Sequence, residues 1–199
     1  MPVSRYLVYL AIAVGGCGLD LLTKYFVFHW RGMPPVPPNA LVLWPMPLDH
    51  REWWLWDGYV GIETSVNQGA LFGLGQGQGF FFSILSIIAA VGILLWLFRF
   101  GAARDWLLTI ALACVTGGIL GNLYDRLGLW EAPGAPGVFP KMVRDWILFR
   151  YHGHTWPNFN IADSLLVSGA CLLMYHGFID RPPAQQLAKK SRTKTASVG

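Results

Sequence analysis

The chain has 199 residues, of which 54% are hydrophobic and only 13% are charged, with a formal net charge of +4. This composition argues against a single water-soluble domain and favours a bilayer as the solvent. The net positive charge is explained below by membrane topology and does not indicate a nucleic-acid partner.

Four apolar runs are long enough to cross roughly 30 Å of hydrocarbon. They cover residues 6–28, 79–98, 106–123 and 161–179. Because no repeat or second domain accompanies them, the pattern predicts one integral membrane domain over residues 1–180. The remaining residues, 181–199, are basic and rich in Ser, Thr, Lys and Ala, so we expect a disordered tail that can rest on anionic lipid.

The basic residues predict how the helices are oriented. Arg5 precedes the first run, and Arg99 and Arg104 lie in the short link between the second and third. Five more follow the fourth run, at Arg181, Lys189, Lys190, Arg192 and Lys194. Since Lys and Arg accumulate on the cytoplasmic side, both termini are predicted to be cytoplasmic and the two long connections to lie outside.

The first long connection, residues 29–78, begins with the Pro-rich turn segment RGMPPVPPN and then has β-prone pieces at 41–44 and 59–66. Its many tryptophans are typical of a membrane interface, so a small sheet at the membrane surface is expected. The second, residues 125–160, contains the non-helical EAPGAPGVFP and then KMVRDWILFRYH, which favours a strand or a short interfacial helix. The predicted fold class is therefore membrane all-α, with four transmembrane helices, a small β-sheet and a short interfacial element outside.

Polar residues inside the apolar runs are expensive and are usually kept for function. Asp20 and Lys24 are spaced i, i+4 and can neutralise each other. A self-contained ion pair that allows insertion and a role in supporting a site both remain open. In the third run, Gly117 and Gly121 form a small-xxx-small pattern that allows close backbone approach.

Two helices present the same Asn-x-x-Asp pattern at the outer border. Asn122 and Asp125 are spaced i, i+3 near the end of the third run, and Asn160 and Asp163 are spaced i, i+3 at the start of the fourth. Helix capping would explain one of these residues but not the repeated pair. The pattern predicts a polar cavity between the two helices.

Asp145 adds a third carboxylate at that level. Two carboxylates in a partly dry site cannot both ionise easily, so one keeps a proton while the other acts as a base, as in an aspartic protease. The residues alone favour Asp125 with Asp163 as the pair. Ser164 has no obvious base, and His152 and His154 lack partners at zinc spacing, so neither a serine mechanism nor a metal is predicted.

Five motifs resemble the lipoprotein signal peptidases, or signal peptidase II, a family of aspartic endopeptidases of the bacterial inner membrane. They are Asp20-x-x-x-Lys24, NQGALFG at 67–73, GILGNLYDR at 118–126, VRDW at 143–146 and FNIADS at 159–164. They occur in the order in which the family has them, and the likeness covers most of the chain.

The resemblance implies four helices with a β-cradle, and cleavage before a diacylglyceryl-modified cysteine of prolipoproteins. It implies Asp145 and Asp163 as the catalytic pair, in place of the Asp125 pairing. The residues that it implies to bind substrate or support the site are Asn67, Gly69, Asn122, Asp125, Arg126, Asn160, Asp20 and Lys24. No cofactor is expected, and the partners are prolipoproteins and membrane lipids around a monomer.

Two other classes of function remain as alternatives. A small proton-coupled transporter would place polar residues at mid-membrane depth and often shows inverted repeats. A non-enzymatic membrane subunit would use its polar faces to bind a partner protein.

Overall fold

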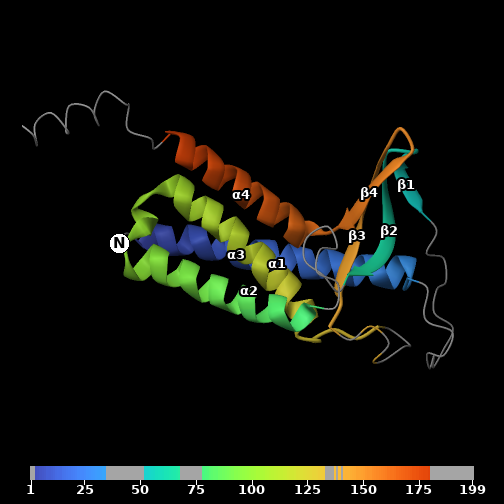
Figure 1. The fold of residues 1–199 in the computed structure, drawn as a ribbon, viewed down its shortest axis with the longest axis horizontal. Coiled ribbons are helices and arrows are strands. Elements are labelled where there is room, and N and C mark those ends of the chain that lie inside the picture. Colours follow the sequence, from blue (N-terminus) through green and yellow to red (C-terminus); the bar gives the residue numbers. More distant parts are fainter. Residues whose placement is uncertain are drawn as a thin grey trace, which may run out of the picture.

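The computed structural model describes residues 3–34, 52–67, 78–132, 137, 139 and 141–179. The strand predicted at 41–44, the tail at 181–199 and Gly69 lie outside the described residues. The described chain forms a bundle of long helices with a small sheet at one end (Figure 1).

Four described helices are long and apolar enough to cross a membrane, as predicted. They are α1 (Val3–Arg31), α2 (Gly79–Leu94, continued by a π-helical turn at Leu95–Arg99), α3 (Trp106–Arg126) and α4 (Ile161–Ile179). In α3, 67% of the most apolar window is buried, against 17% in each of the other three, so α3 is the central helix. It packs against α1, α2 and α4.

The end of the bundle far from the sheet has an apolar core. Tyr9 and Ala13 of α1 pack there with Leu108, Leu112 and Ala113 of α3. Tyr9 donates a hydrogen bond of 2.8 Å to Thr116 Oγ1, so its hydroxyl is not left unpaired in the apolar surroundings.

Small residues on α3 let neighbouring helices approach closely within one chain. A Cβ at Gly117 would lie 3.1 Å from the carbonyl oxygen of Ala13 on α1. A Cβ at Gly121 would lie 2.5 Å from Asp20 Oδ2, so only glycine leaves room for that carboxylate. The small-xxx-small pattern therefore serves packing inside the chain, as predicted.

The sheet is antiparallel, with strand order β1-β2-β3-β4. Its strands are β1 (Trp53–Trp56), β2 (Val60–Asn67), β3 (Val143–Tyr151) and β4 (His154–Phe159). β2 confirms the strand predicted at 59–66, and the KMVRDWILFRYH segment is strand and not helix.

The sequence does not predict the two edge strands, β1 and β4, and it starts the second long connection at residue 125. The WWLW run of β1 shows no apolar-polar alternation. Pro157 argues against a central strand, but an edge strand such as β4 tolerates it. At the start of the segment, α3 continues through Arg126, so Asp125 is helical.

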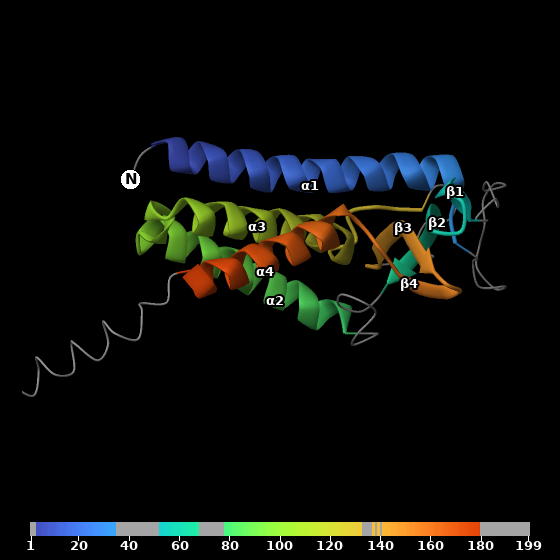
Figure 2. The ribbon, with the colours of Figure 1, turned by 90° about the horizontal axis from the view of Figure 1, so that it is seen from above.

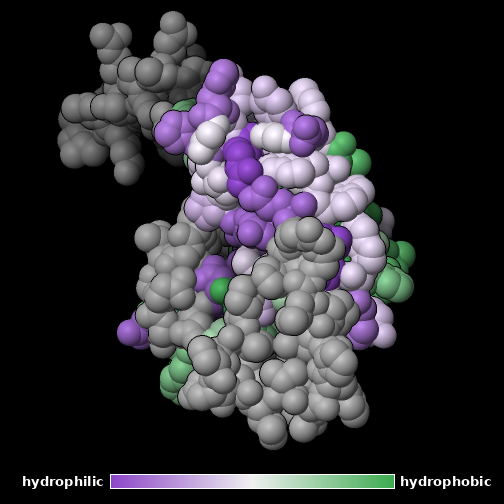
Figure 3. All heavy atoms as spheres, turned by 90° about the vertical axis from the view of Figure 1, so that its right-hand side faces the viewer, coloured by the Kyte–Doolittle hydropathy of each residue, from purple (hydrophilic) through white to green (hydrophobic). Residues whose placement is uncertain are grey.

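The sheet lies at the end of the bundle opposite the described N-terminal end, beside the far part of α1 (Figures 1 and 2). With 29 residues, α1 is about 43 Å long, which exceeds the roughly 30 Å of hydrocarbon. Its last turns pack on the sheet side through Val27 and Phe28. Seen from this end, much of the described surface is hydrophilic (Figure 3).

Candidate active site

Eight polar side chains are buried where the sheet meets the helices, each no more than 8% exposed. We call this set the polar junction: Asp20 and Lys24 of α1, Asn122 and Asp125 of α3, Arg144 and Asp145 of β3, and Asn160 and Asp163 at the start of α4. A buried neutral polar group without a hydrogen-bond partner costs about 1 to 3 kcal/mol, and a buried charge without a partner costs more. The contacts below show how the cluster satisfies itself.

The start of α4 is closed by a reciprocal cap. The Asn160 side-chain oxygen accepts from the Asp163 backbone N–H at 2.9 Å, and Asp163 Oδ2 accepts from the Asn160 backbone N–H at 3.3 Å. This is a capping box. The prediction that capping would explain only one of the two residues is therefore wrong, because a single motif uses both.

α1 completes this cap from outside the helix. Asp20 Oδ1 accepts from the Ala162 backbone N–H at 2.8 Å, so a third N–H at the α4 terminus is paired. Carboxylates at a helix N-terminus also interact favourably with the helix dipole. The contact holds Asp163 at a set position relative to α1.

Two asparagine side chains link the two carboxyl groups that the family resemblance implies to be catalytic. Asn122 Nδ2 donates to Asp163 Oδ1 at 2.8 Å, and Asn160 Nδ2 donates to Asp145 Oδ1 at 2.6 Å. Asn160 Nδ2 also lies 3.1 Å from Asn122 Oδ1. Asp145 on β3 and Asp163 on α4 are thus joined through uncharged donors.

Asp125 faces cations and not Asp163. Arg144 donates to Asp125 Oδ1 from its guanidinium at 2.7 Å and to Oδ2 from its backbone N–H at 3.0 Å. Lys24 Nζ lies 3.2 Å from Asp125 Oδ2. The residue-based pairing of Asp125 with Asp163 is therefore not the one in the structure, because Asp125 is taken up by two positive charges.

The predicted ion pair within α1 is present. Lys24 Nζ lies 2.7 Å from Asp20 Oδ2, and neither side chain is exposed. The pair is not self-contained, because Lys24 also contacts Asp125 and donates to Asn122 Oδ1 at 3.0 Å. Of the two interpretations left open by the sequence, the supporting role has direct contacts behind it.

Burial is the main cause of the raised pKa of Asp145. Loss of hydration, together with the nearby charge of Asp163, raises the pKa of Asp145 to about 8, while Lys24 and hydrogen bonds from Asn160 and Asn67 oppose the rise. A carboxyl group with this pKa keeps its proton at neutral pH.

The remaining predicted residues lie at the edge of the polar junction or outside the described chain. Asn67 ends β2 and hydrogen-bonds Asp145. Arg126 ends α3, places its guanidinium 5.7 Å from the centre of the Phe82 ring, and interacts electrostatically with both Asp145 and Asp163. Gly69 is not among the described residues.

Sequence reasoning missed Arg144, which belongs to the junction through Asp125. A signal was present, because the cluster contains four carboxyl groups and only one other buried cation, Lys24. Buried charges are normally paired, so a neighbouring cation was required. Within the described ranges, no three His, Cys, Asp or Glu side chains are grouped as metal ligands.

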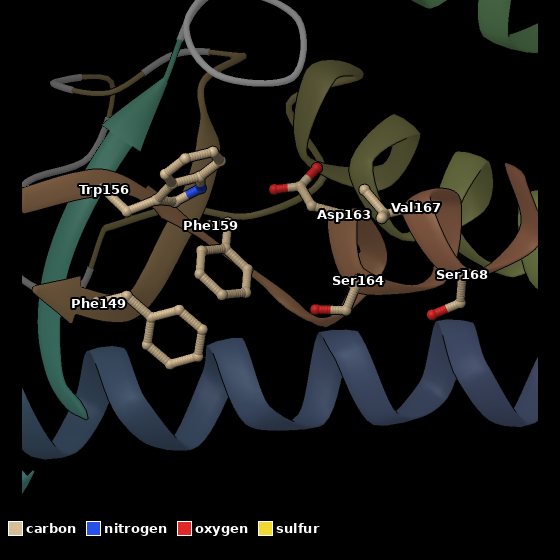
Figure 4. Close-up of a pocket in the computed structure, with 7 residues that line it drawn as sticks. All are labelled: Phe149, Trp156, Phe159, Asp163, Ser164, Val167 and Ser168. Carbon is tan, nitrogen blue, oxygen red and sulfur yellow. The ribbon is translucent and has the colours of Figure 1, made fainter. Parts of the chain in front are cut away.

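Asp163 lies at one end of an apolar cavity of about 370 Å³ between α4 and the sheet. The cavity is lined by Phe149, Trp156 and Phe159 of the sheet segment and by Asp163, Ser164, Val167 and Ser168 of α4. Figure 4 shows the Asp163 carboxyl group directed toward the side of α4 on which the aromatic rings lie. The cavity therefore leaves space beside the Asp163 carboxyl group.

A family model described as signal peptidase (SPase) II matches residues 12–179. The lipoprotein signal peptidase of Rhodopirellula baltica is 49% identical over 178 residues, covering 89% of this chain and 74% of that protein. That of Bacillus pumilus is 36% identical over 124 residues, covering 62% and 72%.

The fold has solved counterparts. A bacterial membrane enzyme determined by the in meso method at 2.3 Å resolution aligns with a TM-score of 0.66 and 25% identity, covering 86% of this chain and 88% of that one. Four apolar helices, a four-stranded sheet and a family match over most of the length lead to one assignment. The chain belongs to the signal peptidase II family of membrane proteins.

Proposed function

We propose that this member of the signal peptidase II family removes signal peptides from prolipoproteins by an aspartic mechanism, with Asp145 and Asp163 as the catalytic pair. The bond cut lies immediately before a diacylglyceryl-modified cysteine. The observation that carries the proposal is the asparagine-linked pair of buried carboxyl groups, of which Asp163 also lines an apolar cavity.

The two carboxyl groups have different surroundings, which supports different roles. Asp163 accepts from Asn122 and from the Asn160 backbone at a helix N-terminus, and both features favour a charged carboxylate. Burial raises the pKa of Asp145 to about 8, which supports Asp145 as the group that holds a proton. In the proposed ground state, Asp163 is the base and Asp145 holds the proton.

The reaction then follows without a covalent intermediate. Asp163 takes a proton from a water molecule as the water oxygen attacks the scissile carbonyl carbon, and Asp145 gives its proton to the carbonyl oxygen. When the tetrahedral intermediate collapses, the C–N bond breaks. The leaving amine takes the proton held by Asp163, and the hydroxyl proton returns to Asp145.

The apolar cavity provides a route for the substrate. Its α4 wall includes Val167, which is 43% exposed on the side of the bundle. Such a surface faces acyl chains in a bilayer, so a lipid-modified segment can approach Asp163 sideways from the membrane. The diacylglyceryl group thereby stays in hydrocarbon while the peptide bond reaches the polar junction.

We further propose the topology and state of the protein. The basic residues around α1, α2, α3 and the tail favour cytoplasmic termini, so the sheet end lies at the outer face of the bacterial inner membrane. Residues 1–180 form one peptidase domain that acts as a monomer among membrane lipids, followed by the basic tail at 181–199. Since the buried acids of the described helices gather at the sheet end, a transporter is not favoured.

The direct test uses purified protein in detergent with two forms of one prolipoprotein, with and without the diacylglyceryl group. We expect cleavage of the modified form only, at the bond before the cysteine, and loss of cleavage in Asp163→Asn. Proton flux into liposomes that contain the protein is measured in parallel. Flux without cleavage would support the transporter, and neither activity, with lipidated substrate and folding confirmed, would support a membrane subunit.

A further inference from the structure

Lys24 is a buried cation for which the proposed reaction has no chemical step. Its ammonium group lies 2.7 Å from Asp20 Oδ2, 3.2 Å from Asp125 Oδ2 and 3.0 Å from Asn122 Oδ1. An ammonium group has three N–H donors and no acceptor, so these contacts use its full capacity. Any side-chain atom that faces the Lys24 ammonium group must therefore accept a hydrogen bond from it.

This requirement fixes the direction of the Asn122 carboxamide. Its oxygen faces Lys24, so its NH₂ group is turned to Asp163 Oδ1, at 2.8 Å. A reversed carboxamide would place its NH₂ against the Lys24 ammonium and its oxygen against the Asp163 carboxylate. Both favourable contacts would then become repulsive.

Asn160 cannot fix Asn122 equally well. Its NH₂ group lies within hydrogen-bond distance of three acceptors: Asp145 Oδ1 at 2.6 Å, Asn122 Oδ1 at 3.1 Å and the Arg144 carbonyl at 3.2 Å. Because an NH₂ group has only two protons to donate, it cannot form full hydrogen bonds to all three acceptors. The shortest contact, with Asp145, is the strongest of the three. Asn160 is itself fixed by the Asp163 backbone N–H, whereas Asn122 depends on a side chain from another helix.

We propose that Lys24 is a positioning residue: by holding Asn122 Oδ1, it directs the Asn122 NH₂ group onto Asp163 and keeps that carboxylate charged for its role as the base. This inference rests on the proposed function. Loss of Lys24 frees the amide to rotate and removes a donor from Asp163, so activity requires a higher pH.

Several charged groups act on Asp163 and must be held constant in the test. Lys24 and Asp20 act on it from α1, Arg126 from α3, and Asp145 from β3. Removing the Lys24 charge acts on Asp163 through space as well as through Asn122. The through-space effect and the effect through Asn122 can be distinguished by changing Lys24 both in wild type and in a variant that lacks the Asn122 amide.

The experiment measures the acid limb of kcat/KM against pH for wild type, Lys24→Met, Asn122→Ala and the double variant. We expect each single variant to move the limb upward by about one pH unit, the scale of one lost hydrogen bond to a charged group. The double variant should move the limb by less than the sum of the two single shifts, because only the through-space effect of the Lys24 charge remains once the Asn122 amide is gone. Such non-additivity is the signature of residues that act through each other.

A matched control removes a buried hydrogen bond elsewhere on α1. Tyr9→Phe deletes the bond to Thr116 in the apolar core, so it should lower thermal stability and leave the acid limb unmoved. If Lys24→Met does not fold, the neutral pair Asp20→Asn/Lys24→Met, read against Asp20→Asn alone, replaces it. The same shift is then expected.

Two results would overturn the inference. One is a lower kcat/KM in Lys24→Met with an unmoved acid limb, which means that Lys24 only neutralises charge for folding. The other is an equal shift with and without the Asn122 amide, which means that its charge acts alone. Both require an active wild type, so they are distinct from failure of the proposed function, in which wild type does not cleave or Asp163→Asn still cleaves.

Discussion

At the end far from the sheet, α1 and α3 pack through apolar side chains such as Ala13 and Leu112, whereas at the sheet end the same helices meet through Lys24 and Asp125. Apolar packing in a bilayer gains contacts but no hydrophobic driving force. Buried ion pairs offset large desolvation costs and are weak evidence for stability. The two ends therefore differ: one holds the bundle together by apolar packing, and the other carries the buried polar groups that the proposed reaction uses.

The largest loss of stability is expected when the buried ion pairs at the sheet end are broken. Asp125→Ala leaves Lys24 and Arg144 without their shared anion, and stranding a buried charge costs about 3–5 kcal/mol. Thermal unfolding in detergent should show the loss, and kcat/KM should fall with it because the Arg144 backbone N–H is also released next to Asp145. Unchanged stability would mean that the ion pairs contribute nothing to the fold.

The apolar end provides the matched experiment. Leu112→Ala empties part of the core around Tyr9, and such truncations cost about 2–5 kcal/mol. We expect no change in kcat/KM, because Leu112 belongs to the apolar core at the end of the bundle far from the sheet. A change in kcat/KM at temperatures where the variant is fully folded would show that the two ends are coupled.

A third variant tests the close contact between α1 and α3. Gly117→Ala would put a methyl group 3.1 Å from the Ala13 carbonyl oxygen, while a Cβ at Gly92 of α2 meets nothing within 4 Å. We expect Gly117→Ala to lose about 1–3 kcal/mol from overpacking and Gly92→Ala to be neutral or to gain up to about 1 kcal/mol of helix propensity. Equal melting temperatures would contradict the packing described here.

The smallest change is one of pH alone. Because burial raises the pKa of Asp145 to about 8, the proton that it donates is present below that pH and lost above it. kcat/KM should therefore fall about tenfold per pH unit on the alkaline side of an apparent pKa near 8. A flat profile to pH 10 would remove Asp145 as the proton donor.

The raised pKa of Asp145 also makes the stability of the protein depend on pH. Between the ordinary carboxyl pKa of about 4 and the folded value, the folded state binds a proton that the unfolded state has released. Raising the pH through that window therefore lowers the free energy of unfolding. Asp145→Asn, which cannot titrate, should lose this part of the pH dependence.

The sequence predicts the helices well because their signal is local. A run of apolar residues must be long enough to span hydrocarbon, and all four predicted runs are found as helices. The edge strands were missed because β1 lacks alternation and β4 contains Pro157. Their strand state depends on pairing with β2 and β3, which no short window reveals.

The site was only partly predictable from the residues. Spacing i, i+3 correctly placed Asn122 and Asp125 near each other on α3, but it says nothing about partners on other elements. The structure turns Asn122 to Asp163 and Asp125 to Arg144, so spacing alone did not show which groups these two residues contact. The choice of Asp145 came from the family resemblance, and its catalytic role stays a prediction.

The central claim is that Asp145 and Asp163 form the catalytic pair and that Asp125 supports them. The most direct measurement compares cleavage of a diacylglyceryl-modified prolipoprotein by wild type, Asp163→Asn, Asp145→Asn and Asp125→Asn, all confirmed folded by thermal unfolding. We predict that kcat/KM drops at least about a thousandfold in the first two variants and much less in Asp125→Asn. An inactive Asp125→Asn beside an active Asp145→Asn would contradict the account.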